Sequence, residues 1–328
     1  METMSEFNME AIRQAAVRLR GQVVRTPLLE SPMLSERAGC RLFVKAEPLQ
    51  RTGSFKIRGA LNKILAMDEP ARRAGIVAFS AGNHGQGVAA AARAVDCPAV
   101  IVMPHTAPRI KVDNCRWWGA EVVTYDPQTE DRVEVAQRVA QPRGMTVVPP
   151  FDDYDIMAGQ GTCGLEIVEQ LNEVQVKPDA VVINCSGGGL ASGVSEAIKD
   201  AFPEAEILIA EVLGFEKVAR SLVMGVPQSN PSVPRTILDG IAGPTAGAKT
   251  VEVLRRHRAR GLGVSDDEGL VGVAAAFRML KLVVEPGGAA ALGAVLAGKA
   301  NVAGKNVVVI ASGGNVDPSV FAQALIRF

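Results

Sequence analysis

The sequence has 328 residues, with 35 Lys or Arg and 35 Asp or Glu, so its formal net charge is zero. This balance, without a basic run, argues against nucleic acid and anionic membranes as partners. Only three histidines occur among a largely apolar composition, which leaves little room for a multi-histidine metal centre, and we expect no bound metal.

Short β-branched runs alternate with helical patterns along the chain. Most runs lack polar alternation, which is typical of strands covered on both faces. The predicted strands are 42–45, 76–80, 99–103, 121–125, 146–148, 180–184, 207–212 and 306–311. The predicted helices are 1–20, 56–65, 85–95, 129–140, 159–171, 190–202 and 265–282, and residues 213–249 are expected to be irregular. This alternation indicates an α/β fold with parallel sheets and crossover helices.

The sequence also favours a cytoplasmic protein. No stretch of about eighteen or more apolar residues occurs, so we expect no membrane-spanning helix and no membrane partner. The polar first 20 residues resemble an amphipathic helix and lack the apolar core of a signal peptide. The five cysteines are dispersed and form no C-x-x-C pair, which is typical of reduced thiols.

Three glycine-bearing loops, residues 80–87, 186–193 and 312–315, each follow a predicted strand, where ligands bind in open α/β sheets. In the second loop, consecutive glycines at 187–189 precede a helix, and such a turn can bring backbone N–H groups to a phosphate. Gly187, Gly189 and Gly193, with Glu211 at the end of the next strand, also approximate a dinucleotide fingerprint. This loop alone does not distinguish NAD from a single phosphate.

Lys56 is the candidate nucleophile. Phe55 and Ile57 flank it, and apolar neighbours favour the neutral amine that Schiff-base chemistry requires. A lysine at the start of a helix, with its stem along an apolar surface and its head in water, would produce the same pattern. The lysine therefore needs further motifs before its role can be assigned.

Residues 51–60 read Arg-Thr-Gly-Ser-Phe-Lys-Ile-Arg-Gly-Ala. This segment resembles the lysine motif of the threonine dehydratase and serine racemase group, whose members use pyridoxal 5'-phosphate (PLP) and have the tryptophan synthase β-like fold, fold type II. Further similar motifs lie, in the order of the family, at 80–87, 149–152, 158–162, 186–190, 285–288 and 312–315. The resemblance covers about residues 25–318, nearly the whole chain.

The resemblance implies a two-lobe α/β protein with parallel-rich twisted sheets covered by helices. Residues 1–51 and 153–328 would form the large PLP-binding domain. Residues 52–152 would form a small mobile domain that contributes Lys56 and the loop 80–87. Family members are homodimers or homotetramers, and either state is expected here.

The same resemblance assigns roles to individual residues. Lys56 would hold the cofactor as a Schiff base and act as the base at the substrate Cα. The other cofactor-binding residues would be Phe55 against the ring, Asn83 at the ring 3-oxygen, Gly187, Gly188, Gly189 and Leu190 at the phosphate, Glu285 near the ring, and Ser312 at the pyridine nitrogen. Glu285 could instead merely cap the helix that contains Gly287. The substrate carboxylate would lie on the loop formed by Ser80, Ala81, Gly82, Asn83 and His84.

Two of these positions favour elimination over racemisation. A hydroxyl at Ser312 cannot keep the pyridine nitrogen protonated as a carboxylate would, which favours early loss of a β-leaving group. Racemases of the group carry a second serine in the carboxylate loop as a base for the opposite face, and this sequence has Ala81 there. We therefore predict a dehydratase, or ammonia-lyase, that converts a β-hydroxy-α-amino acid into a 2-oxo acid and ammonia.

Several alternatives are kept at this stage. The substrate could be threonine, serine, threo-3-hydroxyaspartate or a hydroxyectoine-derived amino acid. A serine or aspartate racemase of the same fold is one other function. An NAD-dependent dehydrogenase, built on residues 187–193 and Glu211, and a non-catalytic amino-acid-binding protein are two from other classes.

The family's divalent-cation site is the place where this sequence departs from the pattern. The register of the resemblance puts Glu211, the carbonyl of Phe215 and the side chain of Lys217 at that site. A lysine where a hard cation requires a carboxylate argues against bound Mg²⁺ or Ca²⁺. Glu216 is one residue out of register to replace it.

Overall fold

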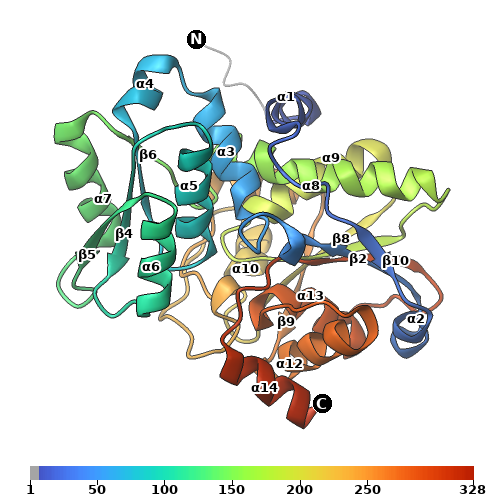
Figure 1. Ribbon diagram of the computed structural model, residues 1–328. Helices are drawn as coiled ribbons and strands as arrows, with labels where there is room; N and C mark the ends of the chain where they lie inside the picture. Colours follow the sequence, from blue (N-terminus) through green and yellow to red (C-terminus); the bar gives the residue numbers. More distant parts are fainter. Residues whose placement is uncertain (1–6) are drawn as a thin grey trace.

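The computed structural model describes residues 7–328 as two parallel-rich sheets covered by helices (Figure 1). The larger sheet has the strand order β1-β2-β10-β7-β8-β9 and the smaller one β5-β4-β3-β6. All neighbouring strands run parallel except β1 and β2. The strands are β1 (Leu28–Glu30), β2 (Arg41–Ala46), β3 (Ile76–Phe79), β4 (Ala99–Pro104), β5 (Glu121–Tyr125), β6 (Thr146–Val147), β7 (Ala180–Asn184), β8 (Glu206–Val212), β9 (Arg260–Val264) and β10 (Asn306–Ala311). The predicted α/β fold with parallel sheets is confirmed.

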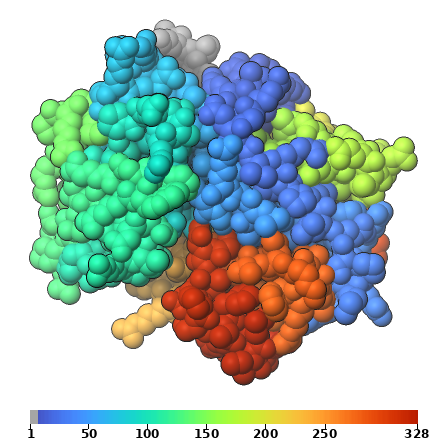
Figure 2. All heavy atoms as spheres, in the orientation of Figure 1, coloured from blue at the N-terminus to red at the C-terminus, as the bar shows by residue number. Residues whose placement is uncertain are grey.

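Helices connect the strands and cover both sheets. In the space-filling view, the cyan and green atoms around the smaller sheet lie beside the blue, orange and red atoms around the larger one (Figure 2). The helices are α1 (Met9–Leu19), α2 (Pro32–Ala38), α3 (Lys56–Ala66), α4 (Glu69–Ala74), α5 (Asn83–Ala94), α6 (Arg109–Trp117), α7 (Arg132–Ala140), α8 (Tyr154–Glu173), α9 (Gly189–Ala201), α10 (Lys217–Met224), α11 (Ala248–Arg256), α12 (Asp266–Ala275), α13 (Pro286–Leu296) and α14 (Pro318–Arg327). Short turns of 3-10 helix are η1 (Glu47–Leu49), η2 (Gln141–Arg143) and η3 (Asp239–Ile241), and η4 (Ala276–Leu280) is a π-helix. No helix within residues 7–328 is long and apolar enough to cross a membrane.

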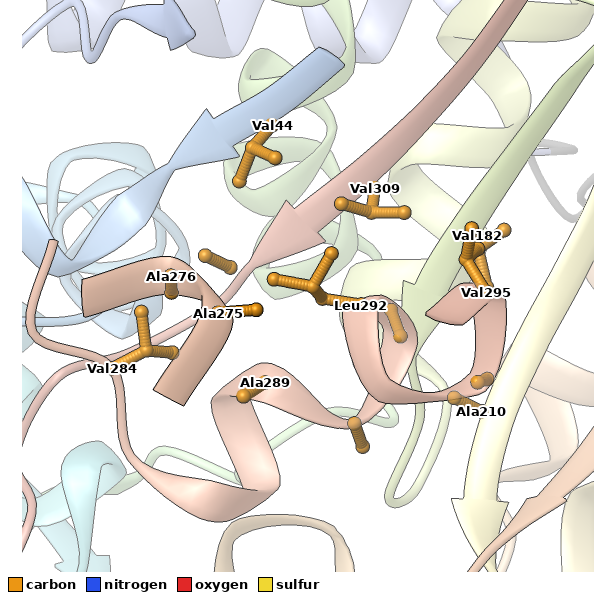
Figure 3. Packing of buried hydrophobic residues seen from close by; sticks show 14 of the residues in the cluster. Val44, Val182, Ala210, Ala275, Ala276, Val284, Ala289, Leu292, Val295 and Val309 are labelled. Atoms are coloured by element: carbon orange, nitrogen blue, oxygen red, sulfur yellow. The ribbon is translucent and has the colours of Figure 1, made fainter. Parts of the chain in front are cut away.

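The strands of the larger sheet are apolar on both faces because helices cover both faces. In β10, Val307 and Val309 face one core cluster, and Val308 and Ile310 face the other. The first cluster includes residues of α12 and α13, and Leu292 and Val295 of α13 lie against the strands that carry Val309 and Val182 (Figure 3). The second packs against α8 and α9. This double coverage explains why the strand sequences lack polar alternation.

The smaller sheet follows the same rule. Ile76 and Ala78 of β3 pack into the core that includes α3 and α5. Val77 and Phe79 lie in a separate cluster with residues of α7. The carboxyl end of β3 leads directly into the glycine-bearing loop that precedes α5.

A buried ion network holds α3 against the larger sheet. Arg58 donates to both carboxylate oxygens of Glu47 at 2.8 Å and pairs with Glu166 of α8 at 2.7 Å, and Arg58 and Glu47 are fully buried. Lys45 of β2 reaches the same Glu166 at 2.6 Å. Burial raises the pKa of Glu47, but the charge and hydrogen bonds of Arg58, together with Lys45 and Thr26, outweigh burial and hold this pKa below its ordinary value. The network fixes the helix that begins at Lys56.

The structure corrects two predicted elements. Residues 213–249 were expected to be irregular, but α10 lies within them, a short helix between Gly214 and Gly225. The predicted helix 265–282 is α12 followed by the π-helix η4, although its predicted capping box at Ser265 and Glu268 is confirmed. For the predicted helix 1–20, the structure gives Met9–Leu19, and residues 1–6 lie outside the described part.

Other elements were not predicted, and two of them, α13 and β9, lack the usual periodicity. Helix α13 is apolar or glycine throughout and buried on every side, so it has no polar face to mark it. Strand β9 contains Gly261, where an added Cβ would lie 2.3 Å from Ala219 of α10, so close packing requires a poor strand former. The remaining unpredicted elements are β1, α2, α4, α6, α11 and α14.

Candidate active site

One cavity of about 330 Å³ collects every residue that the sequence assigned to the site. Loops after β3 of the smaller sheet, and after β7 and β10 of the larger sheet, form its walls. The predicted residues that line it are Phe55, Lys56, Ser80, Ala81, Gly82, Asn83, His84, Gly187, Gly188, Gly189, Leu190, Glu285 and Ser312. Carboxyl ends of parallel strands are where α/β proteins bind ligands.

Lys56 is the first residue of α3, and its ammonium reaches into the cavity wall. The Nζ atom donates to the carbonyl of Pro150 at 2.9 Å and lies 5.2 Å from the ring centroid of Phe55. Burial lowers the pKa of Lys56 to about 8. The apolar setting thus favours a neutral amine, as a Schiff-base nucleophile requires.

The glycine turn at 187–189 is held from behind by large side chains. An added Cβ at Gly187 would lie 2.4 Å from the Phe151 ring, and one at Gly188, whose φ is +103°, would lie 2.7 Å from Thr250. Thr250 Oγ1 donates to the carbonyl of Gly187 at 2.7 Å. The turn leads directly into α9. The first N–H groups of a helix have no acceptor within the helix, so they are suited to bind an anion.

Ser312 is oriented by Asn184, a residue that the sequence analysis missed. Asn184 Nδ2 donates to Ser312 Oγ at 3.1 Å and to the carbonyl of Gly288 at 2.7 Å, while its Oδ1 accepts from the Ala291 N–H at 2.6 Å. Because the amide already donates to Ser312 Oγ, the serine proton is free to be donated into the cavity. The only sequence signal was a polar residue at the end of an apolar strand.

Glu285 lies beside Asn83 at the wall of the cavity. Asn83 Nδ2 donates to Glu285 Oε1 at 2.6 Å, and Asn83 Oδ1 accepts from Asn315 at 2.8 Å. Burial, reinforced by the Asp239 carboxylate, raises the pKa of Glu285 to about 8. Glu285 directly precedes α13, but its side chain makes no capping hydrogen bond to that helix and accepts from Asn83 instead.

Replacing Glu285 by glutamine is expected to stabilise the cofactor-free protein at neutral and alkaline pH. The carboxyl loses its proton near pH 4.5 when unfolded but near 8 when folded, so folding becomes less favourable as pH rises through this window, by about 3 kcal/mol at pH 7. Glutamine keeps an oxygen for Asn83 but does not titrate. The Tm difference between Glu285→Gln and the parent protein, measured from pH 4 to 9, should grow up to about pH 8 and then level off. A difference that is constant across this range would contradict the assignment.

The loop at 80–84 presents backbone groups at the start of α5. Ser80 Oγ accepts from the Gly82 N–H at 3.1 Å, which shapes the turn. Burial lowers the pKa of His84 to about 3, so the imidazole is neutral and its Nε2 donates to the carbonyl of Val148 at 3.1 Å. The positive end of α5, and not a histidine charge, is therefore what this loop offers to a carboxylate.

Lys111 and Arg132 also line the cavity, and the sequence analysis missed both. Lys111 lies on α6, with Nζ 3.9 Å from Asp239 Oδ2. Arg132 begins α7, with its guanidinium 5.7 Å from the ring centroid of Phe79. Each resembles an ordinary surface cation in the sequence, because only the folded smaller sheet brings it to the cavity.

The structure does not support the dinucleotide interpretation of Glu211. This residue ends β8 but is fully buried, and its carboxylate accepts from the N–H groups of Val218 and Ala219 at 2.9 and 2.8 Å. It therefore caps α10 and does not reach the cavity where a ribose would lie.

Comparison with known proteins decides the family. The family model described as pyridoxal-phosphate dependent enzyme matches residues 19–313. The chain belongs to this family. The predicted family, fold type and cofactor are therefore confirmed.

Relatives within the pyridoxal-phosphate dependent family bring the comparison closer. The chain is 41% identical over 319 residues to L-threonine ammonia-lyase of Thermotoga maritima, covering 97% of this chain and 78% of that protein. It is 40% identical over 312 residues to L-threo-3-hydroxyaspartate ammonia-lyase of a Pseudomonas species, covering 95% and 96%. The structure of maize serine racemase superposes with a TM-score of 0.90 at 35% identity, covering 98% of this chain and 97% of that one. The predicted lyase class is confirmed.

The residues present fit pyridoxal phosphate. A lysine with a lowered pKa, a glycine turn at a helix N-terminus and a serine hydroxyl free to donate all face one cavity. These are the partners needed by an aldehyde, a phosphate and a pyridine nitrogen, in that order.

Proposed function

We propose that the protein eliminates water from a β-hydroxy-α-amino acid and releases ammonia and a 2-oxo acid. The observation that carries this proposal is one cavity in which Lys56 faces the glycine turn and Ser312. The ammonia-lyase relatives agree with it. Bound pyridoxal phosphate supplies the electron sink for the charge that develops at Cα.

The residues of this chain perform the remaining tasks. Lys56 Nζ anchors the cofactor and then removes the Cα proton, for which its lowered pKa prepares it. The N–H groups at the start of α5 bind the substrate carboxylate. Ser312 donates a hydrogen bond from a neutral hydroxyl, and Asn184, which donates to Ser312 Oγ, holds that hydroxyl in place. The loop carries Ala81, which has no proton to exchange on the opposite face of Cα, so elimination is favoured over racemisation.

Two cations in the cavity lining bear on which substrate is preferred. Lys111 and Arg132 both come from helices beside the smaller sheet, and both line the cavity that contains the carboxylate loop. A β-hydroxy-α-amino acid with a second carboxylate would place that charge against them. We therefore propose threo-3-hydroxyaspartate as the preferred substrate, ahead of threonine, serine and a hydroxyectoine-derived amino acid.

A product assay tests the function directly. The PLP-loaded enzyme is incubated with L-serine, L-threonine and L-threo-3-hydroxyaspartate, and ammonia, 2-oxo acids and D-enantiomers are measured together. The proposal expects ammonia and a 2-oxo acid in equal amounts, with little D-serine. D-serine as the main product would establish a racemase, and no product from any compound would favour a binding protein.

Replacing Arg132 by glutamine tests the substrate preference. Loss of a charge-assisted hydrogen bond should raise the KM for L-threo-3-hydroxyaspartate about tenfold or more, because such bonds contribute about 1.5–3 kcal/mol. The KM for L-serine, which has no second carboxylate, should stay within about twofold. Equal changes for both substrates would remove the basis for the preference.

We also propose how the enzyme is organised. Residues 52–152 would act as a small domain that moves over the cavity, and residues 1–51 with 153–328 as the large one; the four strands of the smaller sheet all fall within the first range. A cytoplasmic homodimer or homotetramer is the expected form, and size-exclusion chromatography with light scattering measures that state.

A further inference from the structure

A buried ion pair lies at the end of β8, outside the cavity. Lys217 Nζ is 3.4 Å from Glu211 Oε1, and the two side chains are 1% and 0% exposed. Lys217 is the first residue of α10, so its side chain folds back onto the strand that precedes the helix. Burying two charges costs desolvation free energy, which is offset only when further hydrogen bonds satisfy the charged groups. The Glu211 carboxylate has such further hydrogen bonds.

The Glu211 carboxylate is fully engaged. Its Oε1 accepts from the Val218 N–H at 2.9 Å as well as from Lys217, and its Oε2 accepts from the Ala219 N–H at 2.8 Å. The carboxylate thus meets the positive end of α10 and an ammonium together. Burial raises the pKa of Glu211, while Lys217 and the two N–H groups oppose that rise.

The residues here do not fit the divalent cation that the family resemblance implies at Glu211. The Phe215 carbonyl accepts from the backbone N–H of Lys217 at 2.9 Å. Glu216 Oε1 accepts from the Gly214 N–H at 2.9 Å, so this carboxylate stabilises the turn before α10. Within residues 7–328, no group of three or more His, Cys, Asp or Glu side chains could hold a metal ion. A hard cation would lack its oxygen ligands and meet an ammonium instead.

Helix α10 connects this ion pair to the segment that borders the cavity. Ser221 Oγ accepts from the Gln228 N–H at 2.8 Å. The Gln228 carbonyl accepts from Ala246 at 3.1 Å, and the Pro244 carbonyl accepts from Asn230 at 2.8 Å. Residues 228–230 and 244–246 are thus paired through backbone hydrogen bonds. Because α10 holds Gln228 through Ser221, the position of α10 determines the position of both segments.

The segment 243–247 in turn holds the glycine turn. The Gly243 N–H donates to Ser186 Oγ at 3.2 Å, and the Gly247 N–H donates to the carbonyl of Gly187 at 3.2 Å. Gly243 and Gly187 both line the cavity. A continuous set of contacts therefore runs from Lys217 to the loop that we assign to the cofactor phosphate.

We infer that the Lys217 ammonium is a built-in cation that replaces a divalent metal at Glu211, fixes α10 and so positions the glycine turn for the cofactor. Lys217 is a positioning residue, since it touches neither cofactor nor substrate. The inference depends on the family's cofactor and on no particular amino-acid substrate. It predicts that this enzyme needs no divalent cation for stability or for PLP binding.

The test measures Tm of the holoenzyme and PLP affinity by absorbance titration, with EDTA or with millimolar Mg²⁺ or Ca²⁺. The parent protein should give the same values in each condition. Lys217→Met should lower Tm and weaken PLP binding several-fold, and added cations should not restore either. Lys217→Asp should be equally impaired in EDTA but regain Tm and PLP affinity when Mg²⁺ or Ca²⁺ is added, because it supplies a second carboxylate beside Glu211. Lys177→Asp, at an exposed position, is the matched control and should show no such rescue.

Two results would overturn the inference. One is a parent protein that loses Tm or PLP affinity in EDTA and regains it with Mg²⁺ or Ca²⁺, because a bound metal would then be in use. The other is a Lys217→Met protein with parental Tm and PLP affinity. If Lys217→Asp does not fold, the parent and Lys217→Met measurements still decide. Failure of the proposed elimination would leave these readouts unchanged, because neither requires turnover.

Discussion

Replacing Lys56 by alanine is expected to abolish turnover and the visible absorption of the lysine Schiff base together. The variant loses both the cofactor's covalent anchor and the base at Cα, so kcat should fall by at least about 10³-fold. In the parent apoprotein, Schiff-base formation should speed up with pH and level off above about 8, as the amine becomes neutral.

Lys63→Ala is the matched control, because Lys63 lies on the same helix but pairs with Asp153 at 2.8 Å, outside the cavity lining. This control should keep its absorption and most of its activity. Ammonia release by Lys56→Ala at the parental rate would show that another group performs the chemistry.

Replacing Arg58 by methionine is expected to lower the free energy of unfolding more than replacing a residue of an exposed ion pair. It removes a fully buried guanidinium from Glu47 and Glu166 and leaves the buried Glu47 carboxylate without its main counter-charge. Breaking a buried pair in this way costs about 3–5 kcal/mol. Urea unfolding of the holoenzyme should show a lower midpoint, and PLP loss should accompany it, because Arg58 lies only two residues after Lys56 in α3.

The control for this prediction is Arg41→Met. Arg41 pairs with Glu30 at 2.7 Å, but both side chains are more than a third exposed. Exposed pairs contribute about 0–1 kcal/mol, so the unfolding midpoint should barely change. Should Arg58→Met not fold, Glu47→Gln removes the same pair more gently and should still exceed Arg41→Met. Equal midpoints for the buried and exposed variants would contradict the role of the network.

The sequence predicted much of the cavity because its main parts are local motifs. Lys56 with its apolar neighbours and the turn at Gly187–Gly189 each carry their chemistry within a few consecutive residues. Parallel strand ends converge at one edge of a sheet, which explains why the loops after β7 and β10 meet. The family resemblance, and not strand placement, joined Lys56 and the loop after β3 of the smaller sheet to them.

The parts that were missed depend on contacts between distant segments. Asn184 gains its role only when β7 and β10 lie side by side and bring it to Ser312. Arg132 reaches the cavity through the packing of the smaller sheet. The glycines of β9 concealed a strand because α10 needs their lack of side chains, and that requirement is visible only in the folded chain.

The cation site shows a third case. The sequence indicated that Lys217 stands where a carboxylate would be needed, which argued against a metal. The geometry adds that the ammonium itself lies against Glu211 and that the neighbouring carbonyl and carboxylate are engaged elsewhere. Lys217, the residue that departs from the motif, thus provides a positive charge where the metal would be, and its replacement tests that role.

Borohydride reduction of the PLP-loaded protein, followed by peptide mass analysis, tests the central claim most directly. Reduction converts a lysine Schiff base into a stable amine, so the modified residue can be located in a peptide. The structure predicts one phosphopyridoxyl group, on the peptide that contains Lys56, because that amine lies in the cavity with the glycine turn. Attachment to another lysine, or no attachment while ammonia is still released, would contradict it.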